Sequence, residues 1–329
     1  MLDRNRLDVE VLPRMTFAIV GVLAGLALLY FGGEALVKGS ASAALKLGLT
    51  PLVVGLTVVA FATSSPELVV CLDSALNGYG AIAVGNVVGS NILNIGLILG
   101  LSAVVCPIRV QVQLIRYDVP VLIFASLLSV WMLRDIAVGR IEGAVLLTAL
   151  IGYVLFAVLQ ARRECAPQVA GEFVEGVPKP SRAFWIDLLL ITGGLALLVG
   201  GGRVLVMGAV TVARELGMSE ALIGLTIVAA GTSMPEMATS IVAALRREPD
   251  IAIGNILGSN VFNLFGILGA SALTAPLYAQ GVAEVDLAVM IGFALALLPL
   301  LWSGFALNRL EGSLLLLAYG GYVFYLWRS

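Results

Sequence analysis

The sequence predicts an all-α polytopic membrane protein, with ten transmembrane helices arranged as two inverted-topology repeats of five helices each. Three observations favour this fold class. Of the 329 residues, 60% are hydrophobic and only 12% are charged, which is far from the composition of soluble proteins. Several apolar runs reach the roughly 20 residues that a helix needs to cross a bilayer. The chain also contains an internal repeat.

The apolar runs define the expected spans in order along the chain. They are residues 16–46, 51–77, 81–106, 118–133, 138–160, 184–213, 220–246, 250–274, 286–304 and 310–327. None of them shows the alternation of apolar and polar residues that is typical of outer-membrane barrels. We therefore expect a polar N-terminal tail (residues 1–14), a first repeat (15–160), a cytoplasmic loop (161–183) and a second repeat (184–329).

The internal repeat appears when the sequence is aligned with itself so that Gly32 meets Gly201, since residues 32–107 then match residues 201–276 without a gap. Identical residues concentrate in two blocks. The first contains Thr63-Ser64-Ser65-Pro66-Glu67 and Thr232-Ser233-Met234-Pro235-Glu236, and the second contains Gly85-Asn-Val-Val-Gly-Ser-Asn-Ile-Leu-Asn94 and Gly254-Asn-Ile-Leu-Gly-Ser-Asn-Val-Phe-Asn263. Because five spans separate equivalent elements, the two repeats must face opposite sides of the membrane.

The distribution of Lys and Arg predicts the orientation. With the tail outside, the inside loops hold Lys46, Arg109, Arg116, Arg162, Arg163, Lys179, Arg182, Arg246, Arg247 and Arg309. The outside loops hold Arg134, Arg140 and Arg214, while Arg4, Arg6, Arg14 and Arg328 near the termini oppose this assignment. The balance favours both termini outside and the central loop in the cytoplasm.

Composition also excludes several classes of function. A net charge of −2 gives nucleic-acid phosphates no basic surface, and three cysteines without paired spacing do not indicate a disulfide scaffold. The absence of histidine rules out His-ligated zinc or haem sites. We expect no cofactor, no catalytic nucleophile and no nucleic-acid partner; the expected partners are small inorganic cations and the lipid bilayer, and the sequence identifies no protein partner.

Two glutamates lie deep in apolar spans, where an ionised carboxylate costs at least about 2.5 kcal/mol. Glu67 and Glu236 have no Lys or Arg in the neighbouring turns of their helices, so bound cations are the expected compensation. Pro66 and Pro235 precede them, and each proline breaks the backbone hydrogen bonding of its helix. Carbonyl oxygens should therefore become available near Thr63 and Thr232, as hard cations require.

The second block of each repeat supplies a facing polar surface. Asn86, Ser90 and Asn94 are four residues apart and share one helical face, as do Asn255, Ser259 and Asn263. The glycine pairs Gly85 with Gly89 and Gly254 with Gly258 should allow close approach of neighbouring helices. Carboxylates, hydroxyls, amides and carbonyls without thiol or imidazole form an all-oxygen site suited to Ca²⁺ or Na⁺.

The doubled motifs resemble the two α-repeats of the cation/calcium exchanger superfamily, specifically its prokaryotic Na⁺/Ca²⁺ exchangers. The resemblance covers nearly the whole chain. It implies a midplane site between the second, third, seventh and eighth helices, and sliding of the first and sixth helices during transport. It also implies a prokaryotic plasma (inner) membrane location.

The ligands that the resemblance implies for Ca²⁺ are the Glu67 and Glu236 carboxylates with the Thr63 and Thr232 carbonyls. Flanking Na⁺ sites would use Ser64, Ser90, Asn94, Ser233, Ser259 and Asn263, with main-chain oxygens of Ala60 and Ala229 as further candidates. Some family members have Asp where this chain has Asn94 or Asn263, so a K⁺-dependent mode is not implied here. The H⁺/Ca²⁺ branch resembles Gly-Asn-x-x-Glu instead of Thr-Ser-x-Pro-Glu.

The expected function is therefore exchange of Na⁺ for Ca²⁺ by a secondary transporter, not an enzyme. The alternative is an exchanger that couples H⁺ to Ca²⁺ or another divalent cation, since the glutamates could also exchange protons. A cation channel is a less favoured alternative, because pores usually repeat around an axis normal to the membrane.

Overall fold

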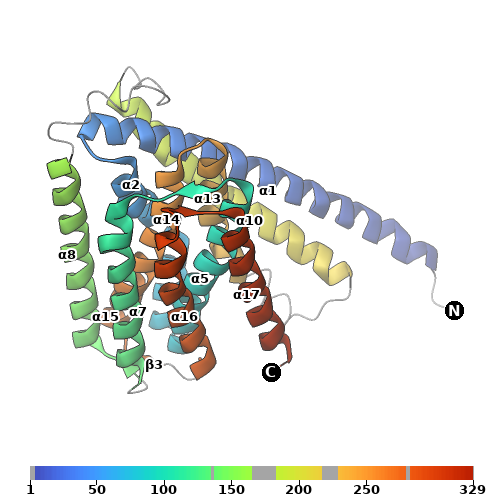
Figure 1. Cartoon of the computed structure of the whole chain (residues 1–329). Coiled ribbons are helices and arrows are strands. Elements are labelled where there is room, and N and C mark those ends of the chain that lie inside the picture. The colour runs from blue at the N-terminus through green and yellow to red at the C-terminus, as the bar shows by residue number, and fades with distance from the viewer. Residues whose placement is uncertain (1–3, 135–136, 165–182, 217–228, 279–281, 329) are drawn as a thin grey trace.

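The computed structural model describes residues 4–134, 137–164, 183–216, 229–278 and 282–328, and helices make up most of them (Figure 1). In the first half, α1 (Arg4–Leu47) precedes a broken span formed by α2 (Pro51–Val54), η1 (Gly55–Val59), α3 (Ala60–Thr63) and α4 (Ser65–Leu76). The next spans are α5 (Gly80–Leu93), η2 (Asn94–Leu99) and α6 (Gly100–Val105), then η3 (Leu114–Asp118) and α7 (Val119–Leu133), then α8 (Arg140–Glu164).

The second half follows the same order. It contains α10 (Phe184–Glu215), then α12 (Ala229–Thr232) and α13 (Met234–Leu245). A long span follows, formed by α14 (Pro249–Val261), η5 (Phe262–Ile267) and α15 (Leu268–Thr274), and the last helices are α16 (Glu284–Trp302) and α17 (Arg309–Arg328). The short turns η1, η2, η3 and η5 are π-helical.

The predicted fold class is confirmed. Within the described residues, seven helices are long and apolar enough to cross a membrane, and the pair Pro51–Thr63 and Ser65–Leu76, bent by 47°, makes an eighth. The start of the expected span 220–246 lies outside the described residues, and the tenth span corresponds to the 20-residue helix α17.

Two expected boundaries differ from the structure. Helix α1 begins at Arg4, so most of the expected tail (1–14) continues the first helix, and α8 extends to Glu164 beyond the expected end at residue 160. The reason is that apolar runs mark the part of a helix that a bilayer covers, whereas backbone hydrogen bonding continues into polar sequence. The remainder of the expected loop, residues 165–182, lies outside the described residues.

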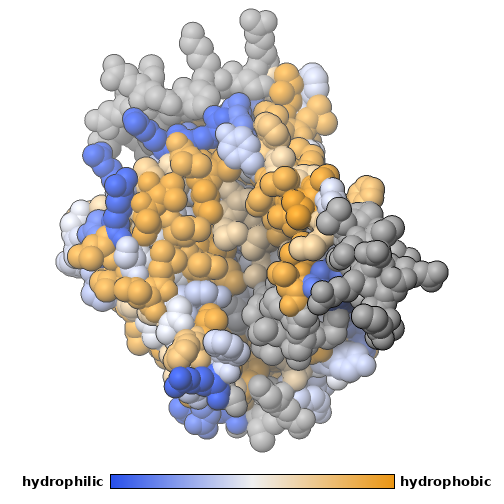
Figure 2. Space-filling view, turned by 90° about the vertical axis from the view of Figure 1, so that its right-hand side faces the viewer, coloured by the Kyte–Doolittle hydropathy of each residue, from blue (hydrophilic) through white to orange (hydrophobic). Residues whose placement is uncertain are grey.

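The burial of the helices places two of them at the centre of the bundle. In the most apolar window of the span Pro249–Thr274, 94% of residues are buried, against 22% for α1, α8 and α10. Figure 2 shows a broad apolar surface with hydrophilic residues gathered toward its upper and lower ends, as expected for a protein solvated by lipid. The span Gly80–Val105 is also mostly buried, so both helices with the Asn–Ser motifs lie inside.

Helices α1 and α10 run side by side and cross the rest of the bundle at a steep angle (Figure 1). Small residues recur every seven positions along their contact. A Cβ added to Gly194 would lie 2.8 Å from the carbonyl oxygen of Gly32, and one added to Gly25 would lie 2.8 Å from that of Gly201. Such contacts let the two backbones approach closely. Buried Asp187 of α10 also accepts a hydrogen bond from Lys46 at the end of α1.

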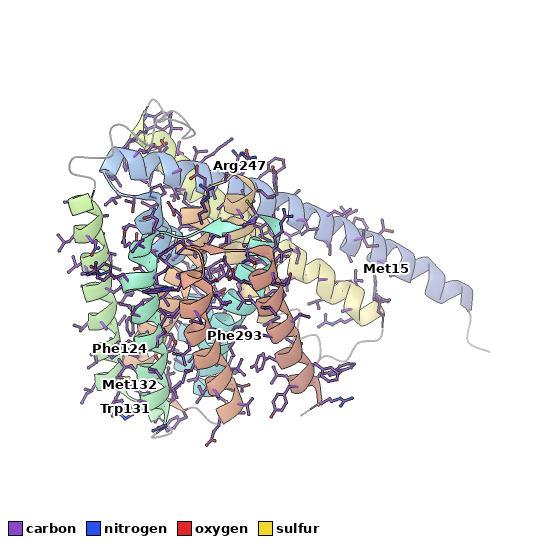
Figure 3. All side chains as sticks on the ribbon, in the orientation of Figure 1. Met15, Phe124, Trp131, Met132, Arg247 and Phe293 are labelled. Carbon is purple, nitrogen blue, oxygen red and sulfur yellow. The ribbon has the colours of Figure 1, made fainter. Side chains whose placement is uncertain are left out.

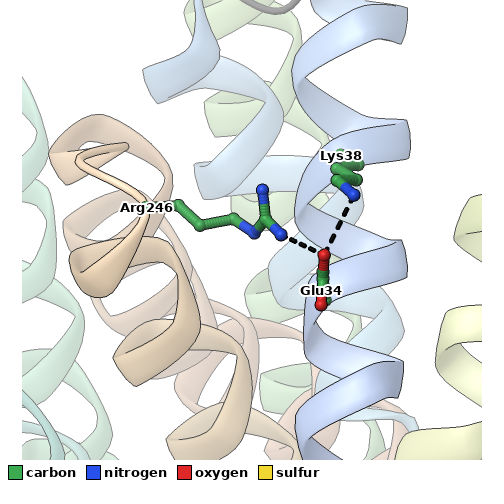
Figure 4. Close-up of polar contacts among 3 residues, drawn as sticks. All are labelled: Glu34, Lys38 and Arg246. Carbon is green, nitrogen blue, oxygen red and sulfur yellow. Dashed lines mark hydrogen bonds and ion pairs between the residues drawn. The ribbon is translucent and has the colours of Figure 1, made fainter.

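An ion pair joins α1 to the turn that follows α13. Glu34 accepts a hydrogen bond from Lys38 at 2.9 Å and a second one from Arg246 (Figure 4). This contact explains two charged residues in an otherwise apolar span, because each charge has a partner. It fixes the position of α1 against the half of the bundle that carries Glu236.

Two short β-ladders each pair a strand of the first repeat with a strand of the second. Strand β1 (Ile108–Arg109) pairs with β4 (Ala306–Leu307), and β2 (Ala137–Val138) pairs with β3 (Leu277–Tyr278). Extended past residue 107, the alignment of the repeats matches Ile108 with Leu277 and Val138 with Leu307, so each ladder joins the two repeats in reciprocal fashion. Because α7 runs from one ladder to the other, they lie at opposite ends of the bundle. Figure 3 shows Arg247 at one end and Trp131 at the other.

Candidate cation site between the two repeats

The chain is interrupted at the same point in both repeats. Helix α3 ends at Thr63, Ser64 has φ −82° and ψ 5°, and α4 begins at Ser65. Ser233 between α12 and α13 has nearly the same conformation, with φ −88° and ψ 10°. In each case the proline two residues later favours the first turn of a new helix, because it has no backbone N–H to donate. The two glutamates therefore lie in the first turn of α4 and α13, where the helix dipole favours negative charge.

The two repeats exchange hydrogen bonds at these interruptions. The Ser64 hydroxyl donates to Oε1 of Glu236 at 2.8 Å, and the Ser233 hydroxyl donates to Oε1 of Glu67 at 2.9 Å. Both glutamates are 1% exposed, and their charges interact with each other. Each repeat thus orients the carboxylate of the other.

One oxygen of each carboxylate has no partner among the described residues. Oε2 of Glu67 and Oε2 of Glu236 are buried without a hydrogen bond, as are Oγ of Ser259 and the Oδ1 atoms of Asn94 and Asn263. Buried polar atoms in folded proteins nearly always have partners. These five oxygens belong to residues of the predicted site, and they are of the carboxylate, hydroxyl and amide types that hard cations bind.

Helices α5 and α14, with the π-helical turns η2 and η5 that continue them, carry the remaining predicted ligands against the broken helices. Ser90, Asn94, Ser259 and Asn263 are all buried. Asn94 donates through Nδ2 to Oδ1 of Asn260 at 3.1 Å, a contact between the two central spans. In this arrangement Oδ1 of Asn94 and Nδ2 of Asn260 are the amide atoms without a hydrogen bond.

The structure brings most of the predicted residues to one buried region. Hydrogen bonds connect Ser64 with Glu236 and Ser233 with Glu67, and the Thr63 hydroxyl donates to Asn255 at 3.0 Å. Thr232 is half-buried at the end of α12, and Ala60 is buried at the start of α3. Ala229 is the first residue of α12. The described residues contain no cluster of three or more His, Cys, Asp or Glu, so two carboxylates and neutral oxygens make up the site.

The sequence reasoning missed several polar contacts. Asn260 and Ser240 did not enter the predicted site, although both hydrogen-bond to amides of the repeated motif. A second duplicated feature was also missed: Tyr153 donates to Asp118 at 3.0 Å, and Tyr322 donates to Asp286 at 2.8 Å. The gapless alignment of the repeats matches the two tyrosines with each other but sets Asp118 against Leu287, the neighbour of Asp286, and so hides the equivalence.

Comparisons with known proteins agree with this arrangement. The sodium/calcium exchanger protein family matches residues 17–159 and 186–328. The chain is 40% identical over 323 residues to CaxA of Alkalimonas amylolytica, covering 96% of this chain and 100% of that protein. It is 30% identical over 341 residues to the sodium/calcium exchanger MaX1 of Methanosarcina acetivorans, covering 91% and 95% of the two chains.

Solved structures of the sodium-calcium exchanger NCX_Mj have the same fold. The structure soaked with zero Na⁺ and Ca²⁺ superposes with a TM-score of 0.81 at 32% identity, covering 95% of this chain and 99% of that chain. The family matches two separate segments of the chain. The alignment that pairs Glu67 with Glu236 also pairs residue 17 with 186 and residue 159 with 328, so the two segments are the two repeats. This chain belongs to the sodium/calcium exchanger family, as an integral membrane protein of its prokaryotic type.

Proposed function

We propose that this protein exchanges Na⁺ for Ca²⁺ across the membrane by alternating access, at the site between Glu67 and Glu236. The reciprocal bonds Ser64–Glu236 and Ser233–Glu67 carry the proposal, because they hold two carboxylates in place and leave one oxygen of each for an ion. Family membership supports exchange of cations.

We assign Ca²⁺ to the Glu67 and Glu236 carboxylates and the main-chain oxygens of Thr63 and Thr232. Flanking Na⁺ ions would use Ser64, Ser90, Asn94, Ser233, Ser259 and Asn263, with the carbonyl oxygens of Ala60 and Ala229 as additional ligands. The buried unpaired oxygens of Asn94, Ser259 and Asn263 support this assignment. No resident cofactor enters the mechanism, since Ca²⁺ and Na⁺ are the cargo.

Charge balance explains why exchange is obligatory. One Ca²⁺ or two Na⁺ neutralise the two glutamates, so the ions compete for the same carboxylates. An empty site would bury two uncompensated charges, which is costly in a region of low dielectric constant. Crossing is therefore favoured only when the site is loaded. If a third Na⁺ binds neutral oxygens, each cycle moves one charge and couples to about 2.3 kcal/mol per 100 mV.

The proposed membrane orientation places the central loop, residues 161–183, in the cytoplasm and both termini outside, with residues 15–160 and 184–329 as the two repeats. The ladder β1–β4 supports this, because it places Arg109 near Arg309, and the hydrogen bond from Gln111 to Asp250 places Arg246 and Arg247 at the same end of the bundle. The ladder β2–β3 lies at the other end, close in sequence to Arg134 and Arg140. Basic residues gather on the cytoplasmic side of membrane proteins.

Coupling to H⁺ is the alternative, because protons could compete for the same glutamates. A cation channel would conduct continuously without a counter-ion. Uptake of radiolabelled Ca²⁺ into proteoliposomes, with Na⁺, K⁺ or H⁺ gradients imposed separately, distinguishes the three functions. Only an outward Na⁺ gradient should drive uptake. Uptake driven by a pH gradient without Na⁺, or Ca²⁺ current without any counter-ion, would contradict Na⁺ coupling.

A further inference from the structure

Asn255 on α14 contacts residues from both repeats. Its Oδ1 accepts the hydrogen bond from the Thr63 hydroxyl at 3.0 Å. Its Nδ2 donates to Oγ of Ser240 at 2.9 Å and to the main-chain oxygen of Glu236 at 3.4 Å. Asn255 is fully buried. One amide therefore connects the end of α3 in the first repeat with the first two turns of α13 in the second.

The chemistry of these neighbours fixes the orientation of the amide. The carbonyl oxygen of Glu236 can only accept a hydrogen bond, so the group beside it must be the NH₂ group of Asn255. The oxygen of the amide then faces the Thr63 hydroxyl, which donates to it. A carboxylate at this position would place oxygen against oxygen, and an apolar side chain would leave Thr63 and Ser240 without this partner.

Helix α14, which carries Asn255, packs closely against the first repeat. A Cβ added to Gly254 would lie 2.7 Å from the main-chain oxygen of Leu52, and one added to Gly258 would lie 2.4 Å from that of Leu56. These are backbone contacts on either side of Asn255 along α14. The Asn255 amide therefore lies on a helix whose distance from the broken span is set by the contacts of Gly254 and Gly258 with that span.

The first repeat has a different version of this contact. The equivalent residue, Asn86, is half-buried and donates through Nδ2 to Sγ of Cys71 at 3.2 Å. Cys71 stands where the second repeat has Ser240, and a thiol is a weaker hydrogen-bond acceptor than a hydroxyl. Asn255 therefore donates to a stronger acceptor, the Ser240 hydroxyl, than Asn86 does.

We propose that Asn255 is a positioning residue that sets the separation of Thr63 and Glu236 and thereby the affinity of the site for Ca²⁺. This inference rests on the proposed function, in which both residues supply Ca²⁺ ligands. Asn255 does not bind the ion itself, because its three polar contacts are with protein groups. Glu236 neutralises either ion, but the Thr63 carbonyl is assigned to Ca²⁺ alone, so the effect should be larger for Ca²⁺ than for Na⁺.

The test is Asn255→Ala in the full-length protein reconstituted in proteoliposomes. The Ca²⁺ concentration for half-maximal exchange should rise about tenfold, as expected when two orienting hydrogen bonds are lost. The Na⁺ concentration for half-maximal exchange should change by a clearly smaller factor, because Na⁺ shares the Glu236 carboxylate but is not assigned the Thr63 carbonyl. Equal shifts for both ions, unchanged values, or a loss of maximal rate alone would overturn the proposal.

Ser240→Ala provides a second variant that removes only one contact, and it decides the question if Asn255→Ala does not fold. It should raise the half-maximal Ca²⁺ concentration about two- to fivefold; a value equal to that of the unmodified protein would overturn the proposal. Ser126→Ala is the matched control, since Ser126 is a buried serine whose hydroxyl donates to the main-chain oxygen of Leu122 in its own helix.

Stabilisation of the detergent-solubilised protein by Ca²⁺, measured as a thermal shift, separates this inference from the proposed function. If Ca²⁺ stabilises the unmodified protein but no Na⁺ gradient drives flux, Na⁺ coupling is wrong, and the midpoint of the Ca²⁺ titration still tests Asn255. A midpoint for Asn255→Ala that matches the unmodified protein would refute the positioning role.

Discussion

Replacing one glutamate of the site by glutamine, Glu67→Gln or Glu236→Gln, should abolish Ca²⁺ exchange while leaving the protein folded. In Glu67, Oε1 accepts from Ser233 at 2.9 Å and Oε2 has no partner among the described residues. Glutamine keeps the shape and an oxygen for the serine. It removes the negative charge and puts an NH₂ group where the ion ligand was.

The two effects on free energy have opposite signs. Removing one partner of a buried charge pair costs about 3–5 kcal/mol, so Ca²⁺ should bind on the order of 10²–10⁴ times more weakly. Without ions, the same change removes a buried carboxylate that costs at least about 2.5 kcal/mol in a membrane helix. The ion-free variant should therefore be at least as stable as the unmodified protein.

Thermal unfolding in detergent, with and without Ca²⁺, measures both effects. Each variant should keep its ion-free midpoint or show a higher one, and should lose the Ca²⁺-dependent shift. Flux of radiolabelled Ca²⁺ into proteoliposomes measures transport. Substantial Na⁺-driven flux in both variants, with an unchanged Ca²⁺ shift, would refute the assignment of the two carboxylates.

Three further predictions test the packing, the neutral amides and the orientation. Gly194→Ala places a Cβ 2.7 Å from the main-chain N of Leu36 and should lower the free energy of unfolding by about 1–3 kcal/mol, whereas Gly193→Ala, which meets nothing within 4 Å, should not; equal midpoints would contradict the close packing of α1 on α10. Asn263→Asp adds a third carboxylate, and the three cannot all stay ionised unless a proton or another cation joins them, so flux should gain a new pH dependence; superimposable pH profiles would place residue 263 away from the ions. A membrane-impermeant thiol reagent, read by mass spectrometry, should label Cys165 in the central loop only from the cytoplasmic face, and labelling only from outside would reverse the orientation.

The predictable part of the site follows from features that are local in sequence. A charge such as Glu67 in an apolar run is conspicuous because the bilayer penalises it, and Pro66 directly before it favours a helix interruption because it removes a backbone donor. The internal repeat then doubles both signals, at Glu236 and Pro235. No knowledge of long-range contacts is needed to nominate the residues.

The partners of these residues could not be predicted in the same way. Asn255 shares a helical face with Ser259 and Asn263, but its bond to Thr63 joins two different repeats. The Tyr153–Asp118 hydrogen bond has an equivalent in the second repeat, but a one-residue difference in spacing keeps the two aspartates from aligning. Such contacts depend on the exact packing of helices, which apolar periodicity does not specify.

The sequence by itself determined that this is a membrane protein built from two inverted repeats, each with one buried glutamate after a proline. It did so because the length of apolar runs and the cost of buried charge are properties of single segments. Only the tertiary structure decided that Ser64 bonds to Glu236 and Ser233 to Glu67. That exchange arises from the antiparallel packing of the repeats, which brings each helix interruption against the carboxylate of the other repeat.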